Sequence, residues 1–129
     1  TGLTVAITPA ASTSKILVFV NTIVAANAVA GMSMALFRDT TQIDLGAAVS
    51  SHARTSKGLV STDGSRYVAL MSTHFLDSPS STSELVYGIK LAHSSSSSKT
   101  IYVNRDGDYT DSFGYPGSSS TITVMEIGA

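Results

Sequence analysis

Apolar and polar residues alternate along most of this 129-residue chain, and this spacing constrains the fold more than any other feature. Successive side chains of a β-strand point to opposite faces, so such alternation indicates strands with one buried face. Residues 84–93 (ELVYGIKLAH) show the pattern, as do residues 120–127 (STITVMEI) and 3–8 (LTVAIT). No segment shows a convincing spacing of 3.6 residues, which a helix requires.

Turn-forming residues divide the chain into about eight such strands. Further strands are predicted at residues 15–24, 29–37, 58–61, 65–77 and 99–104, with a weak one at 42–50. Residues 15–24 are apolar on both faces, so we expect this strand to be central, with residues 29–37 as its hairpin partner. This number of short strands predicts an all-β fold, an antiparallel β-sandwich of the jelly-roll type.

Residues 16–37 are uncharged and long enough to cross a bilayer. Two buried strands joined by a turn are the better interpretation. The first half is rich in β-branched and aromatic residues, polar residues interrupt the stretch at Asn21, Asn27 and Ser33, and the sequence AANA supplies a turn. We therefore expect no membrane insertion.

Charged residues make up only 13% of the chain, about half the usual level for a globular domain. The net charge is −1, and the eight Lys and Arg residues are scattered, so no basic stripe indicates a nucleic-acid partner. The absence of cysteine excludes disulfides and thiolate metal sites. We expect one domain over residues 1–129, the C-terminal portion of a longer chain, which buries apolar surface against copies of itself as a homotrimer.

The most chemically dense segment is residues 104–117, NRDGDYTDSFGYPG. Asn104, Asp106, Asp108 and Asp111 offer the oxygen ligands that calcium prefers. The EF-hand pattern is not met, because its glycine is misplaced and its terminal glutamate is missing. We favour a hairpin turn on Asp106 and Gly107, in which glycine accepts a positive φ.

The same segment is a candidate for ligand binding. Its aromatic rings can stack on sugar rings while its carboxylates accept hydrogen bonds from sugar hydroxyls. The alternative is that the rings cover the end of the sandwich or a neighbouring subunit. The candidate residues are Asp106, Asp108, Tyr109, Asp111, Phe113 and Tyr115.

No pattern for catalysis, metal or cofactor is met. His52, His74 and His93 lack the spacing of a zinc site. Ser33 in GMSMA resembles a nucleophile elbow, but no helix is predicted after it. Nothing fixes the separation that paired carboxylates need for glycoside cleavage. We therefore expect no enzyme and no cofactor.

Four motifs occur in order: GLTVAITPAASTSKILVFVN, HFLDSPSSTSELVYGIKL, TIYVNR and SSSTITVMEIGA. Together they resemble a domain often found at the C-terminal end of tail-fibre and related structural proteins of tailed bacteriophages, particularly those from aquatic sources. The resemblance covers nearly the whole chain. It implies a virion structural protein, trimeric, with a β-sandwich head and no catalytic set. Its residues 76–79 and 104–105 look structural, at strand ends and turns.

The expected function is therefore the trimeric head of a fibre or spike on the virion, which engages the host cell surface through a glycan or other receptor. Its partners are further copies of the chain, other virion proteins and that receptor. The alternative is a capsid-decoration or head-fibre protein that stabilises or adorns the shell. An enzyme acting on polysaccharide is the third and least favoured interpretation.

Overall fold

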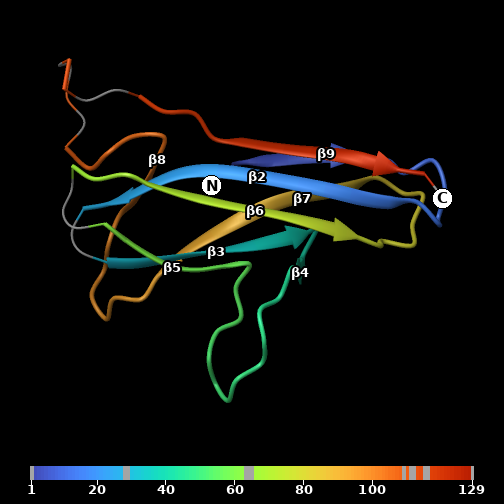
Figure 1. The fold of residues 1–129 in the computed structure, drawn as a ribbon, viewed down its shortest axis with the longest axis horizontal. Helices are drawn as coiled ribbons and strands as arrows, with labels where there is room; N and C mark the ends of the chain where they lie inside the picture. The colour runs from blue at the N-terminus through green and yellow to red at the C-terminus, as the bar shows by residue number, and fades with distance from the viewer. Residues whose placement is uncertain are drawn as a thin grey trace.

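The computed structural model describes residues 2–27, 30–62, 66–108, 110, 113–114 and 117–128. Within them the chain forms two antiparallel sheets and no helix (Figure 1), which confirms the all-β prediction. The strands are β1 (Thr4–Ile7), β2 (Lys15–Ala26), β3 (Ala30–Arg38), β4 (Thr41–Ile43), β5 (Lys57–Thr62), β6 (Ala69–Asp77), β7 (Leu85–His93), β8 (Ile101–Val103) and β9 (Thr121–Ile127).

The two sheets contain five and four strands. In the five-stranded sheet β7 lies between β1 and β3, and both β4 and β5 pair with the other edge of β3. In the four-stranded sheet β2 lies between β6 on one side and β8 and β9 on the other. The predicted central position of residues 15–24 is therefore confirmed.

The predicted hairpin between residues 15–24 and 29–37 is wrong, because β2 and β3 belong to different sheets. The end of β2 is held elsewhere: the Asn27 amide donates to the Thr100 carbonyl (3.2 Å), and Asn27 Oδ1 accepts from the Thr100 amide (3.1 Å). The chain then crosses to the other sheet, where β3 pairs with β7. Among the described residues, no helix is long and apolar enough to span a membrane.

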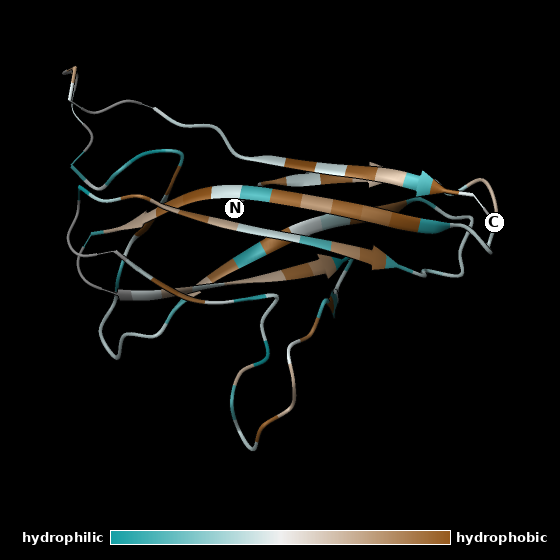
Figure 2. Cartoon of the chain, viewed as in Figure 1, coloured by the Kyte–Doolittle hydropathy of each residue, from teal (hydrophilic) through white to brown (hydrophobic). Residues whose placement is uncertain are grey.

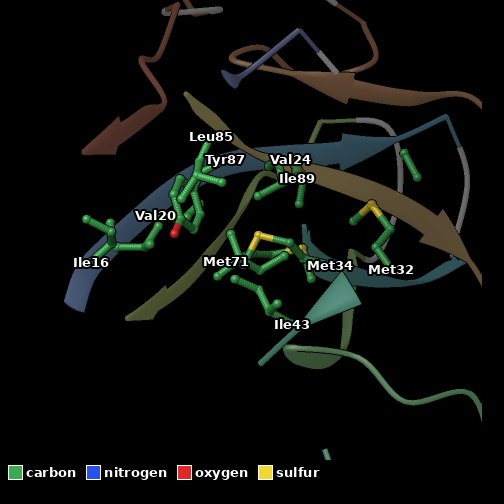
Figure 3. Packing of buried hydrophobic residues seen from close by; sticks show 13 residues of the cluster. Ile16, Val20, Val24, Met32, Met34, Ile43, Met71, Leu85, Tyr87 and Ile89 are labelled. Atoms are coloured by element: carbon green, nitrogen blue, oxygen red, sulfur yellow. The ribbon is translucent and has the colours of Figure 1, made fainter. Parts of the chain in front are cut away.

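The core lies between the sheets and is built by the predicted alternation. On β7, Leu85, Tyr87 and Ile89 point inward and are buried, and they meet buried residues of β2 and of β6, such as Met71. Figure 3 shows side chains of this single cluster. Full burial of one such aliphatic side chain stabilises the fold by about 1.5–3 kcal/mol.

Several predicted strands are shorter than expected, and residues 99–104 contribute only β8. Residues 42–50 contribute only the end of β4, because Asp44 takes a positive φ of 51° and ends the strand. Residues 44–56 instead form a long connection that extends away from the two sheets (Figure 1). Residues 65–77 contribute β6, which begins at Ala69.

Candidate functional site

The described residues of the segment 104–117 lie in the connection between β8 and β9, at the opposite end of the molecule from the C-terminus (Figure 1). Asn104 anchors both ends of this connection. Its amide donates to the Ile23 carbonyl (3.0 Å), and its own carbonyl accepts from the Ser118 amide (2.8 Å). Asn104 has a φ of 66°, a left-handed conformation that asparagine tolerates better than most residues. The backbone of Asn104 therefore fixes the base of the segment on β2.

Side chains reinforce this base. The hydroxyl of Ser120 donates to Asn104 Oδ1, accepts from the Ile23 amide (3.1 Å) and lies 3.1 Å from the hydroxyl of Thr22. Thr22 is fully buried, so this contact supplies the partner that a buried hydroxyl needs.

The hairpin that we favoured over a calcium loop is not formed, because β8 and β9 each pair with β2 and not with each other, but residues 106–108 make a local turn. Asp106 is buried, and its Oδ1 accepts from the Asp108 amide (3.1 Å), a turn that aspartate commonly forms. Among the described residues of the segment, Asn104 has a left-handed backbone.

Two of the oxygens proposed for calcium accept these hydrogen bonds. Asn104 Oδ1 is used by Ser120 and Asp106 Oδ1 by the turn, while Asp108 is exposed and Asp111 lies outside the described residues. Within the part of the chain that the structure describes, no three His, Asp or Glu side chains are grouped in a way that could hold a metal ion.

The candidate aromatic residues are described only in part. Phe113 has an exposed fraction of 105%, so it does not cover the end of its own sandwich, and that interpretation is wrong for this ring. Tyr109, Asp111 and Tyr115 lie outside the described residues. Of the candidate residues, the structure brings Asp106 and Asp108 together in the turn and leaves Phe113 exposed to solvent.

Three polar residues join the two sheets in what we call the interlayer clamp: Arg38 of β3, Asp77 of β6 and Tyr87 of β7. Asp77 Oδ2 accepts from Arg38 Nη1 (2.7 Å) and from the Tyr87 hydroxyl (2.7 Å). Asp77 is 6% exposed and Tyr87 is fully buried. Burial raises the pKa of Tyr87 well above its ordinary value, and its hydrogen bond to Asp77 and the negative charge of Asp77 raise that pKa further.

The sequence identified Asp77 only as a strand end. Its role was detectable, because Asp77 is in phase with the inward-facing Met71 and Thr73 of the same strand. A carboxylate on the buried face of a strand needs a cation or a hydrogen-bond donor. Which residues supply them, Arg38 and Tyr87, depends on how the sheets pack.

The outer face of the four-stranded sheet carries large apolar side chains. Leu17 of β2 is directly opposite Leu76 of β6 on one side and Met125 of β9 on the other, and Ile127 follows on β9. The exposed fractions are 47% for Leu76, 51% for Met125 and 42% for Ile127. We call these four residues the outer apolar cluster. In Figure 2 the hydrophobic colour follows β2 toward this end of the sheet.

No protein-family model matches the chain, and no curated protein matches it. The surfaces that bear on function are the outer apolar cluster and the exposed ring of Phe113.

Proposed function

We propose that this chain is the head domain of a fibre or spike on a tailed-bacteriophage particle, that it assembles as a homotrimer, and that it binds a glycan of the host surface. The outer apolar cluster carries this proposal. Three strands contribute to one contiguous apolar row on a face that is open to water in the single chain. Contiguous exposed apolar side chains of this kind can mark an interaction site.

The total surface supports the same inference. The chain exposes 7262 Å², whereas a free-standing chain of 13.3 kDa is expected to expose roughly 6,450 Å². The excess, to which the extended connection 44–56 contributes, is roughly 800 Å², about what one partner buries in a standard protein interface. A closed threefold arrangement buries the same patch on every subunit.

The topology supports the jelly-roll form of the sandwich. The central strand β2 pairs with β6 and β9, which are distant in sequence, and β1 pairs with β7. Such non-consecutive antiparallel pairing is a property of Greek-key arrangements, from which jelly rolls are built.

The resemblance to fibre domains is supported by the use of its motif residues. Asp77 of the motif LDSP joins the two sheets, and Asn104 of the motif VNR fixes the last long connection. Both residues hold the architecture, as the resemblance implies for structural positions. Phe113 presents an aromatic ring to solvent at the end of the sandwich, where three copies of a weak site add avidity without new contacts.

Assembly is tested by measuring the mass of the purified chain by light scattering after size exclusion. We expect about 40 kDa, three times 13.3 kDa. Met125→Lys and Leu76→Lys are each expected to give a folded monomer, since both side chains are exposed in the single chain. Val86→Lys is the matched control and is expected to leave the trimer intact, because Val86 is exposed on the other sheet. A wild-type monomer contradicts the assembly.

Attachment is tested on the particle that carries the chain. Immunogold labelling is expected at a fibre or spike tip, and an excess of free chain is expected to block adsorption to host cells. Phe113→Ala is expected to weaken that block while leaving the melting temperature unchanged. Labelling spread over the capsid, with no block of adsorption, overturns the attachment function in favour of a decoration protein.

A further inference from the structure

A hollow of about 390 Å³ lies beside the middle of β6, and none of the described residues of the segment 104–117 lines it. Phe19, Asn21, Ser72 and His74 line it from β2 and β6, and Lys57 lines it from the start of β5. Its size falls within the range of small-molecule sites, which is roughly 300–1,000 Å³.

The register of two strands brings four of these side chains together. Phe19 is directly opposite His74, and Asn21 is directly opposite Ser72. Because residues two apart on a strand share a face, all four lie on the outer face of the four-stranded sheet. Each of them is exposed, with Phe19 at 39%.

A β-bulge brings Lys57 to this place. Met32 pairs with Val60 and Met34 pairs with Lys57, so β5 uses one residue more than β3 between the two pairs. The extra residue puts Lys57 opposite the inward-facing Met34, on the side of the sheet that faces β6. In Figure 1 the start of β5 lies near the middle of β6.

Hydrogen bonds fix the position of the walls of the hollow. Ser56, next to Lys57, donates from its amide to the Met34 carbonyl (3.0 Å), and its hydroxyl accepts from the Leu36 amide (2.8 Å). On β6, the hydroxyl of Thr73 donates to Asp44 Oδ2 (2.8 Å) and holds the connection 44–56 against that strand. A site whose walls are held in this way loses little freedom when a ligand binds.

We propose that this hollow binds a sugar that carries a carboxylate, such as a uronic acid residue. The ring of Phe19 offers a flat apolar surface for the C–H face of a sugar, and Asn21 and Ser72 offer donors and acceptors for its hydroxyls. Lys57 supplies the cation, and the acidic residue next to the hollow, Asp44, is not among its lining residues and accepts a hydrogen bond from the Thr73 hydroxyl. The lining therefore favours an acidic sugar over a neutral one.

Other ligand classes fit less well. A phosphate site commonly uses arginine forks or several backbone amides, and the residues lining this hollow include one lysine and no arginine. Glycoside cleavage requires paired carboxylates, which the lining residues do not supply. The proposed site therefore binds a sugar and does not cleave it. Its affinity for a sugar is a property of the chain alone, whereas the host surface as the source of that sugar rests on the proposed function.

The test is titration of the ¹⁵N-labelled full chain with digalacturonate, followed by amide chemical shifts, with galactobiose and inorganic phosphate as separate probes. We expect saturable shifts at Asn21, Lys57 and Ser72 with digalacturonate, and binding of galactobiose roughly two- to fivefold weaker. Lys57→Gln is expected to weaken digalacturonate roughly two- to fivefold and to leave galactobiose unchanged, the effect of one exposed ion pair.

The matched control is Lys90→Gln, which removes the same charge from the outer face of the other sheet, where Lys90 Nζ lies 4.0 Å from the Phe37 ring centroid. Phe19→Leu keeps an apolar side chain but removes the ring, and it is expected to weaken both sugars. The proposal is overturned if neither sugar shifts the amide signals of the residues lining the hollow. It is also overturned if phosphate binds as tightly as digalacturonate, or if Lys90→Gln weakens digalacturonate binding as much as Lys57→Gln does. A failure of particle adsorption alone contradicts the proposed function and leaves this site standing.

Discussion

Replacement of Asp77 tests whether the interlayer clamp holds the two sheets together. Asp77→Ala removes the acceptor of two hydrogen bonds of 2.7 Å and leaves the Arg38 guanidinium and the Tyr87 hydroxyl without it. Breaking a buried charge pair costs about 3–5 kcal/mol. The side chain of Arg38 is 23% exposed, so water relieves part of this penalty. We therefore expect a loss of about 2–4 kcal/mol for Asp77→Ala and about 1–3 kcal/mol for Asp77→Asn, which keeps one acceptor.

The assay is urea unfolding followed by circular dichroism, with all variants at one protein concentration because assembly stabilises by mass action. Asp108→Asn is the control, since Asp108 is exposed, and it is expected to change the free energy of unfolding by less than about 0.5 kcal/mol. The triple change of Asp77→Leu, Arg38→Met and Tyr87→Phe is expected to recover much of the loss, since it leaves no uncompensated polar group.

The reasoning is refuted if Asp77→Ala is no less stable than Asp108→Asn. It is also refuted if the triple variant is as unstable as Asp77→Ala, because the loss then does not come from polar groups without partners.

Three further perturbations test the packing and the electrostatics. Because the folded-state pKa of Tyr87 is raised, only the unfolded chain releases this proton just above pH 10, so stability should fall as the pH rises from there, and Tyr87→Phe should show a shallower fall in melting temperature. A Cβ on Gly88 would lie 2.8 Å from Thr4 Cγ2, so Gly88→Ala should cost about 1–3 kcal/mol in urea unfolding, and Thr4→Ser should recover part of that cost. Hydrogen bonds from the Ser14 hydroxyl and the Ala10 amide lower the pKa of Glu126 from its ordinary value of 4.5. The pKa of Glu126 measured by NMR titration should therefore lie below 4.5, and it should rise in the variant Ser14→Ala. The stability that Glu126 adds is then lost only as the pH falls through that lowered pKa.

The sequence was enough to predict local turns of the candidate site, but not which distant residues the fold brings together. The turn at Asp106 follows from residue type, because aspartate bonds its own backbone two residues on. The hollow beside β6 was not predictable, since it requires the pairing of Phe19 with His74 and a bulge that turns Lys57 toward β6. Pairing and bulges arise between strands distant in sequence, where single-sequence patterns carry no signal.

Alternation along β7 was enough to identify which of its residues face the core, because the direction of a strand side chain depends only on its place in the strand. Apolar residues on both faces of residues 15–24 were enough to predict that β2 is central. Packing decided which sheet each strand joins. The end of β2 is hydrogen-bonded to Thr100 through Asn27, whereas β3 pairs with β7 in the other sheet. Asp77 accepts hydrogen bonds from Arg38 and Tyr87. The physical reason is the sequence separation of the interacting residues. The direction of a side chain is local to its strand, whereas strand partners and polar contacts across the core form between segments that meet only in the folded chain.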